Sequence, residues 1–230
     1  MGLTEISDDG GVRTRRVEAT VDGELIPGLL WTPSEVTVNS PLVLLGHGRS
    51  MDKSMWQKDL APRFVARGWN ALAIDAPGHG ERRPTDATGW LRPDVDEAEA
   101  GWHAAVNVVN VEAGIGVDRL AYWGFSMGAS LGISLISGDA RFEAAVLGLM
   151  HADWPVPPGT RIRIDAAALT LPVLFVMNWD DTRAPREGAL ELFDLFASTD
   201  KRLLAYPGEH GQLPQEAFDI SEDFLTRHIG

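Results

Sequence analysis

Short runs rich in Val, Leu and Ile alternate along the chain with longer stretches in which apolar residues recur at helical spacing. The short runs are typical of parallel strands buried on both faces, and the longer stretches are typical of helices that cover a sheet. The pattern predicts an α/β fold, with a mostly parallel, twisted sheet and helices on both of its faces.

About eight strands are predicted, the first two joined as a hairpin by the Asp22-Gly23 turn. They span residues 13–20, 24–31, 42–45, 70–75, 119–123, 144–149, 173–178 and 202–206. Helices are predicted over residues 54–67, 94–113, 127–136, 186–196 and 214–228. Ser54 is the candidate N-cap of the first helix, and Gly68 is its candidate stop.

Only 22 residues separate Met150 from Val173. This connection contains the proline-rich stretch 154–159, which is expected to form an irregular loop, and it is too short for a large lid. The pocket beneath it is therefore expected to be fairly open.

Length and composition favour one globular domain. The chain has 230 residues and a hydrophobic share of 44%, so it can bury one substantial core over residues 1–230. No apolar run approaches the roughly 18 residues of a membrane span. The first residues contain no basic region followed by an apolar one, so the predicted location is the cytoplasm.

Charge and cysteine content narrow the possible functions. With no cysteine, the chain has no thiol nucleophile and no thiolate metal site. The formal net charge of -13 opposes binding to nucleic acid or to an anionic membrane surface. A neutral or cationic small molecule is the expected partner, and the oligomeric state is left open.

The pentapeptide Gly124-Phe125-Ser126-Met127-Gly128 lies where a predicted strand ends and a predicted helix begins. It fits a nucleophile elbow, in which glycines at both ends relieve crowding in a sharp turn that presents a serine oxygen. A glycine-rich turn with a capping serine has the same pattern. The position between strand and helix makes Ser126 the candidate nucleophile.

A carboxylate and a histidine follow in the chain order that such an elbow requires. Asp180 and Asp181 come directly after the strand at 173–178, and His210 follows the strand at 202–206. The imidazole would take the serine proton, and a carboxylate would hold the imidazole in the right tautomer. His210 is therefore the candidate general base, with either aspartate as its partner.

Two further motifs precede the elbow: Leu44-Leu45-Gly46-His47-Gly48-Arg49, and Asp75-Ala76-Pro77-Gly78-His79-Gly80. With these motifs the chain resembles the α/β-hydrolases, close to the dienelactone-hydrolase-like and small carboxylesterase branch, over nearly its whole length. Dienelactone hydrolases use a cysteine where this chain has Ser126, so an ordinary esterase is the closer expectation.

The resemblance implies the α/β-hydrolase fold, no cofactor and no metal. It assigns the oxyanion hole to the backbone amides of Arg49 and Met127. It favours Asp181 over Asp180 as the triad acid, because Asp181 stands four residues before Pro185, as in the family pattern. His79 is expected to stabilise a turn.

Several aromatic side chains and histidines are candidates for lining the substrate pocket. His151 and Trp154 follow the strand at 144–149 on its carboxyl side, where ligands bind in open α/β sheets. The other candidates lie in the His-Gly motif or in or near connections: His47, Trp90 and Trp102. Packing of the tryptophans beneath loops is the alternative interpretation.

The prediction is a serine-dependent carboxylic ester hydrolase that acts on a small to medium, apolar substrate through an acyl-enzyme. The same constellation serves thioesterase, lactonase, peptidase and carbon-carbon hydrolase or lyase chemistry. A non-catalytic small-molecule receptor on this scaffold is the alternative from another class.

Overall fold

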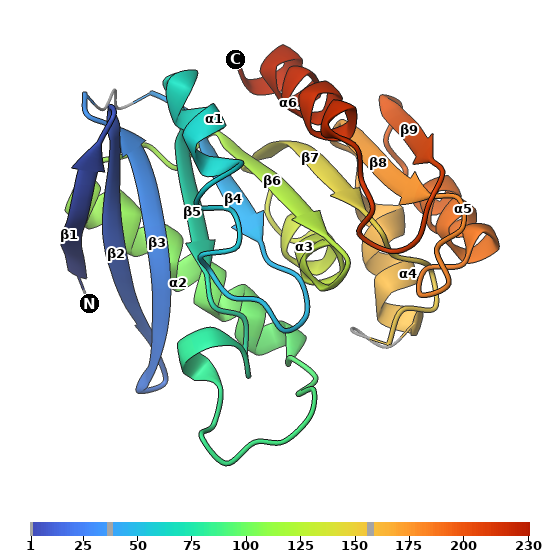
Figure 1. The fold of residues 1–230 in the computed structure, drawn as a ribbon, viewed down its shortest axis with the longest axis horizontal. Coiled ribbons are helices and arrows are strands. Elements are labelled where there is room, and N and C mark those ends of the chain that lie inside the picture. Colours follow the sequence, from blue (N-terminus) through green and yellow to red (C-terminus); the bar gives the residue numbers. More distant parts are fainter. Residues whose placement is uncertain (1, 36–38, 156–158) are drawn as a thin grey trace. The chain divides into compact units, whose positions relative to one another are not determined.

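The computed structural model describes residues 2–35, 39–155 and 159–230. The chain divides into two compact units, Met1–Leu120 and Ala121–Gly230. Figure 1 shows the strands and helices of each. Residues 156–158 of the proline-rich stretch lie outside the described residues. None of the helices among the described residues is long and apolar enough to cross a membrane.

The first unit contains five strands in the order β1-β2-β3-β5-β4. They are β1 (Gly2–Asp9), β2 (Val12–Val21), β3 (Glu24–Pro33), β4 (Leu42–Gly46) and β5 (Asn70–Ile74). Three pairs are antiparallel: β1 with β2, β2 with β3, and β3 with β5. β4 pairs with β5 in parallel. The predicted hairpin and the strands near 42–45 and 70–75 are confirmed.

Strand β1 was not predicted, so the described residues contain nine strands, one more than expected. Its sequence, Gly-Leu-Thr-Glu-Ile-Ser-Asp-Asp, is mostly polar, and none of its residues is buried. Because β1 is an edge strand held by its backbone pairing with β2, it leaves no hydrophobic alternation in the sequence.

The helices of the first unit are α1 (Ala61–Ala66) and α2 (Val95–Ala113). Helix α2 agrees with the prediction for 94–113: Asp94 caps it by accepting from the backbone N–H of Glu97, and Gly114 ends it at a φ of 64°. The prediction of a helix over 54–67 is wrong for its first half. Pro62 has no N–H to donate and fits only the first turn of a helix, so α1 begins at Ala61.

Ser54 therefore does not cap a helix. Its backbone N–H and its hydroxyl both donate to the Asp52 carboxylate, at 2.7 and 2.6 Å. Gly68 does lie just beyond the helix end, with a φ of 80°, as its predicted role as a stop requires.

The second unit contains four strands in the order β6-β7-β8-β9. They are β6 (Leu120–Phe125), β7 (Phe142–Gly148), β8 (Val173–Asn178) and β9 (Lys201–Tyr206). β7 pairs with β8, and β8 with β9, in parallel. Helices α3 (Met127–Ser137), α5 (Arg186–Leu195) and α6 (Gln215–Ile229) match the predictions to within a few residues.

Helix α4 (Gly159–Ala168) lies in the connection from 150 to 173, for which the sequence pattern predicts no helix. Within it, Ile162 is buried while Ile164 is 64% exposed, so no apolar stripe marks it as a helix. Its packing on α3 and α5 determines its structure instead.

Strand β6 carries helices on opposite faces, as predicted for the sheet. Successive side chains of a strand point to opposite faces. The Tyr122 hydroxyl donates to the carbonyl of Gly128 in α3 at 2.7 Å. The next residue, Trp123, stacks on Phe218 in α6 with ring centroids 6.0 Å apart.

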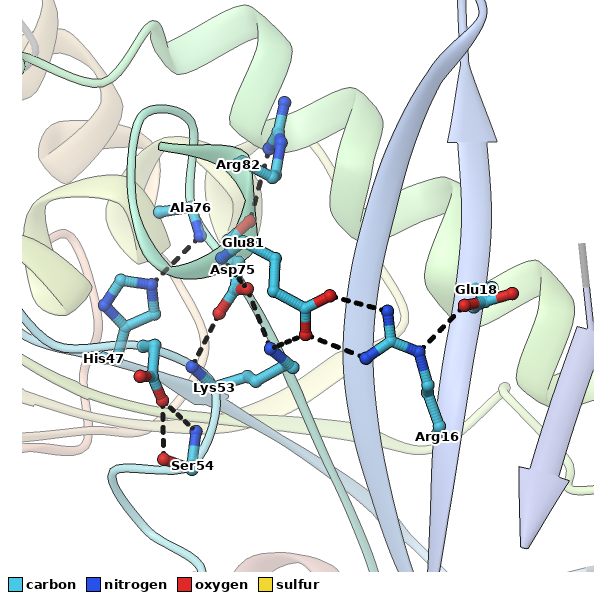
Figure 2. Close-up of polar contacts among 10 residues, drawn as sticks. Arg16, Glu18, His47, Lys53, Ser54, Asp75, Ala76, Glu81 and Arg82 are labelled. Atoms are coloured by element: carbon cyan, nitrogen blue, oxygen red, sulfur yellow. Dashed lines mark hydrogen bonds and ion pairs between the residues drawn. The ribbon is translucent and has the colours of Figure 1, made fainter. Parts of the chain in front are cut away.

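In the first unit, a buried ion pair joins the segment after β4 to the turn after β5 (Figure 2). The Asp75 carboxylate is fully buried. It accepts hydrogen bonds from the backbone N–H and the Nζ of Lys53, both at 2.9 Å, and from the backbone N–H of Glu81 at 2.9 Å. The buried charge of Asp75 is therefore paired with a cation and hydrogen-bonded by two backbone donors.

Glu81 extends this cluster toward β2. Its carboxylate accepts two hydrogen bonds from the Arg16 guanidinium, at 2.8 and 2.7 Å, and one from Lys53 Nζ at 2.7 Å. Hydrogen bonds from Arg16 first, and then from Lys53, lower the pKa of Glu81 to about 2. Glu81 therefore stays ionised throughout the neutral range.

His47 connects the same two segments. Its side chain is buried, and the Ala76 backbone N–H donates to Nε2 at 3.0 Å. Nδ1 must then carry the proton, which it donates to the Gly48 carbonyl at 2.9 Å. Burial lowers the pKa of His47, so the neutral ring is the form that fits. His79 is also buried and lies within hydrogen-bonding distance of the Pro77 carbonyl through Nδ1, in agreement with a turn-stabilising role.

Replacing Lys53 by methionine is expected to destabilise the protein by about 3–5 kcal/mol, because the buried Asp75 carboxylate loses its cation. Urea denaturation of wild type and Lys53→Met measures the change. Arg163→Met is the matched control, since the ion pairs of Arg163 with Asp153 and Glu191 are exposed. Equal shifts in the two variants would contradict a special cost at Asp75.

Stability is expected to fall as the pH drops below about 6.5, the pKa of an unfolded histidine. His47 binds its proton less readily when folded than when unfolded, so protons favour the unfolded chain and stability is complete only above that pH. The contribution of His47 to the slope is at most about 1.4 kcal/mol per pH unit. Thermal unfolding of wild type and His47→Gln between pH 7.5 and pH 5 tests this, and parallel curves would refute it.

Candidate active site

Ser126 lies at the sharp turn between β6 and α3 with a φ of 55° and a ψ of -123°. A positive φ is strained for a residue with a Cβ atom, so surrounding contacts must hold it. The Ser126 N–H donates to the carbonyl of Gly148 at the end of β7, at 2.8 Å, and the Ser126 carbonyl accepts from the Ser130 N–H at 3.0 Å. These bonds fix the turn on both sides of the serine.

Close packing requires a glycine at position 124, two residues before the serine. A Cβ atom on Gly124 would lie 2.8 Å from the backbone carbon of Gly128 and 2.7 Å from the Tyr122 ring. No side chain fits at those distances, so strand and helix can approach only if residue 124 is glycine. The local sequence therefore has the structure expected of a nucleophile elbow.

His210 follows β9 and reaches both Ser126 and Asp181. Its Nε2 is 2.9 Å from Ser126 Oγ, and its Nδ1 is 2.7 Å from Asp181 Oδ2. An ionised carboxylate only accepts hydrogen bonds, so Nδ1 carries the imidazole proton and Nε2 is free to accept from the serine hydroxyl. This is the tautomer that a general base needs.

The two adjacent aspartates have different environments. The Asp181 side chain is 1% exposed, and its Oδ1 accepts from the backbone N–H groups of Arg183 and Ala184, at 2.8 and 2.9 Å. Asp180 is exposed, and its Oδ2 accepts from the Gly208 N–H at 3.1 Å. Of the two, Asp181 contacts the imidazole.

The two oxyanion candidates lie in different units. Met127 is the first residue of α3, where helix amides have no partner within the helix. Arg49 lies in a turn after β4 that is closed by a hydrogen bond from the Met51 N–H to the Gly48 carbonyl at 3.1 Å. The Arg49 guanidinium is 5.2 Å from the ring centroid of Trp90, a cation–π contact.

Besides Trp90, which contacts Arg49, the other four pocket-lining candidates divide into two pairs. Trp154 lies nearly parallel to the His210 ring, with centroids 6.3 Å apart, and His151 meets Trp154 edge-on at 5.3 Å. Burial lowers the pKa of His151. His47 and Trp102 are instead 2% and 4% exposed, which places them in the interior of the first unit.

One polar residue near the candidate triad was missed by the sequence analysis. Asn178, the last residue of β8, is 1% exposed and donates to the carbonyl of Glu209, next to His210. The sequence contains a signal for this residue, because Asn178 is a polar residue at the carboxyl end of an otherwise apolar strand. Ligand sites of open α/β sheets form at the carboxyl ends of the strands. No group of three or more metal-ligating side chains occurs among the described residues.

The chain is similar to several known proteins. It is 26% identical over 154 residues to polyketide transferase ATR5 from Stachybotrys chlorohalonatus (strain IBT 40285), covering 66% of this chain and 48% of that protein. It is 27% identical over 111 residues to quorum-quenching protein AidA from Acinetobacter baumannii (strain MDR-ZJ06), covering 47% of this chain and 35% of that protein. The chain thus spans about half or less of the length of these relatives.

Among solved structures, a PEG-bound cold-adapted esterase from an Arctic intertidal metagenomic library has a TM-score of 0.86 and 32% identity, with 100% of both chains covered. An acetyl xylan esterase from Paenibacillus sp. R4 shares the fold, with a TM-score of 0.76 and 18% identity over 97% of this chain and 87% of that one. The profile of the alpha/beta hydrolase family matches residues 42–224. Because this profile spans most of the chain, the chain belongs to the alpha/beta hydrolase family.

Proposed function

We propose that this protein is a serine-dependent carboxylic ester hydrolase that works through an acyl-enzyme. The observation that carries the proposal is the hydrogen-bonded series from Ser126 Oγ to His210 to Asp181, with distances of 2.9 and 2.7 Å. The 32% identity to a structure described as an esterase supports ester hydrolysis in particular. The family profile spans parts of both units, which supports our proposal that residues 1–230 act as one domain.

In the first half of the reaction, His210 Nε2 takes the hydroxyl proton as Ser126 Oγ attacks the ester carbonyl carbon. The negative charge of the tetrahedral intermediate is assigned, on the sequence pattern, to the backbone amides of Met127 and Arg49. The intermediate then expels the alcohol, which receives the proton from His210. The acyl group stays bonded to Ser126.

In the second half, water replaces the alcohol. His210 Nε2 takes a proton from the water as its oxygen attacks the acyl carbon, and the proton returns to Ser126 Oγ when the acid leaves. In both halves Asp181 stabilises the positively charged imidazole through Oδ2, while its Oδ1 accepts from the backbone N–H groups of Arg183 and Ala184.

A small to medium substrate with an apolar group is our proposal for the substrate class. Trp154 and His151 supply aromatic surface beside His210. A net charge of -13 disfavours polyanionic substrates. Apolar acyl or alcohol groups gain most from such a surface, because their burial is favourable without further hydrogen bonds.

Ser126→Ala is expected to lower kcat for p-nitrophenyl acetate and butyrate by about 10⁶-fold, because the nucleophile acts as one unit with its base. The same substitution should abolish labelling by a fluorophosphonate probe, while the circular dichroism spectrum stays that of wild type. Full ester hydrolysis by the alanine variant would rule the mechanism out, and an unlabelled wild type would favour a receptor.

The neighbouring aspartates provide a matched pair. Asp181→Asn is expected to lower kcat by about 10⁴-fold, since the amide no longer holds the imidazole in the required tautomer. Asp180→Asn should cost less than about tenfold, because its side-chain oxygen still accepts from the Gly208 N–H. Steady-state kinetics on p-nitrophenyl butyrate distinguish them, and the reverse order would assign the triad acid to Asp180.

A further inference from the structure

Two loops of the second unit carry the base and its carboxylate, and they are paired along their length. The acid loop (residues 178–184) starts at the last residue of β8, and the histidine loop (residues 206–212) starts at the last residue of β9. Asn178 lies opposite Tyr206 at the ends of these parallel strands. Beyond them, the Trp179 N–H donates to the Tyr206 carbonyl at 2.7 Å and the Asp180 N–H to the Gly208 carbonyl at 3.2 Å.

Asn178 adds a second bond between these loops that is not exposed, besides the one from His210 to Asp181. Its Nδ2 donates to the carbonyl of Glu209 at 2.6 Å, and the residue is 1% exposed. Its Oδ1 is buried and accepts no hydrogen bond within the described part of the chain. An amide with an unpaired buried oxygen is costly, so packing gives no reason for asparagine at this position.

Two further side-chain contacts between the loops are exposed. Asp180 Oδ2 accepts from the Gly208 N–H at 3.1 Å, and the Thr182 hydroxyl donates to Glu209 Oε2 at 3.1 Å. Water competes for these groups, so each contributes little. The bond from Asn178 is shielded from this competition and is also the shorter one.

The bonded carbonyl is next to His210 in the chain. The Glu209 carbonyl and the His210 nitrogen belong to one planar peptide unit, so a bond that holds the oxygen also fixes the plane from which His210 Cα extends. His210 must reach Ser126 at 2.9 Å and Asp181 at 2.7 Å at the same time. A small rotation of this peptide would lengthen at least one of the two bonds.

We infer that Asn178 is a positioning residue: by holding the Glu209 carbonyl, it aims the His210 imidazole at Ser126 and Asp181. This deepens the proposed function and rests on it. Asn178 touches neither the substrate nor the reacting atoms and acts only through the Asp181–His210 pair. Its removal should therefore change kcat and leave substrate binding nearly intact.

The first test is Asn178→Asp, which keeps the size of the side chain and removes its N–H donors. We expect kcat for p-nitrophenyl butyrate to fall by about 10²-fold with little change in KM, since a misplacement of about 1 Å has effects of this size. Asn178→Ala, which adds no charge, should give a loss of the same order. A wild-type kcat in both variants would overturn the inference.

Asn70→Asp is the matched control. Asn70 is also a buried asparagine at a strand end whose Nδ2 donates to a loop carbonyl, that of Ser40, and whose Oδ1 is without a partner among the described residues. Its side-chain and backbone N–H groups donate to the carbonyls of Ser40 and Pro41, which belong to the first unit. Its kcat should stay near that of wild type, and a loss equal to that of Asn178→Asp would indicate a merely structural effect.

The second test asks whether Asn178 acts through Asp181. In an Asp181→Asn background, where the imidazole is no longer held, Asn178→Asp should change kcat by less than about threefold, because contacting groups in one network are not additive. The same 10²-fold loss in both backgrounds would mean that Asn178 acts independently of the pair, which would overturn the inference.

A proton NMR measurement, which does not depend on catalysis, separates this inference from the proposed function. The proton on His210 Nδ1, shared with Asp181, should give a downfield resonance in the proton NMR spectrum of the wild type and of Asn70→Asp. We expect it to be shifted or lost in Asn178→Asp and Asn178→Ala. If the wild type hydrolyses no ester but these spectra differ as expected, the positioning role stands and the esterase proposal fails. Unchanged spectra would refute the positioning role whatever the activity.

Discussion

The hydrogen bond between Asp181 Oδ2 and His210 Nδ1 is the interaction on which the proposed chemistry depends. It decides where the imidazole proton resides, and therefore whether Nε2 can accept a proton from Ser126. The bond also joins the ends of two neighbouring parallel strands, because Asp181 follows β8 and His210 follows β9. Parallel strands bring such residues to one edge of the sheet without any contact close in sequence.

A second constraint is the strained turn that carries the serine. A non-glycine residue at positive φ costs of order 1–3 kcal/mol, and here the cost is offset by backbone bonds to Gly148 and Ser130. The close approach of β6 and α3 leaves no room for a side chain at Gly124. Strand, turn and helix are thus packed closely together around Ser126, the candidate nucleophile.

Agreement between sequence and structure was best where side chains are buried in a regular pattern. Strand β8 is apolar up to its last residue, Asn178, and α2 has both a capping aspartate and a terminating glycine, so each was predicted nearly to its ends. Elements held by other forces were missed. Strand β1 is polar and paired at an edge, α4 lacks an apolar stripe, and α1 is shortened by Pro62.

The sequence by itself determined the α/β class and the candidate residues. Hydrophobic periodicity is a local property of each segment, and the order of Ser126, the aspartates and His210 can be seen directly along the chain. Only the tertiary structure decided which aspartate contacts the imidazole, which nitrogen carries the proton, and that Asn178 holds the peptide before His210. Each of these depends on the direction of a side chain within a turn and on a partner about 30 residues away in the chain. Distances and directions of that kind arise only when β8 and β9 pair, so no pattern in the sequence contains them.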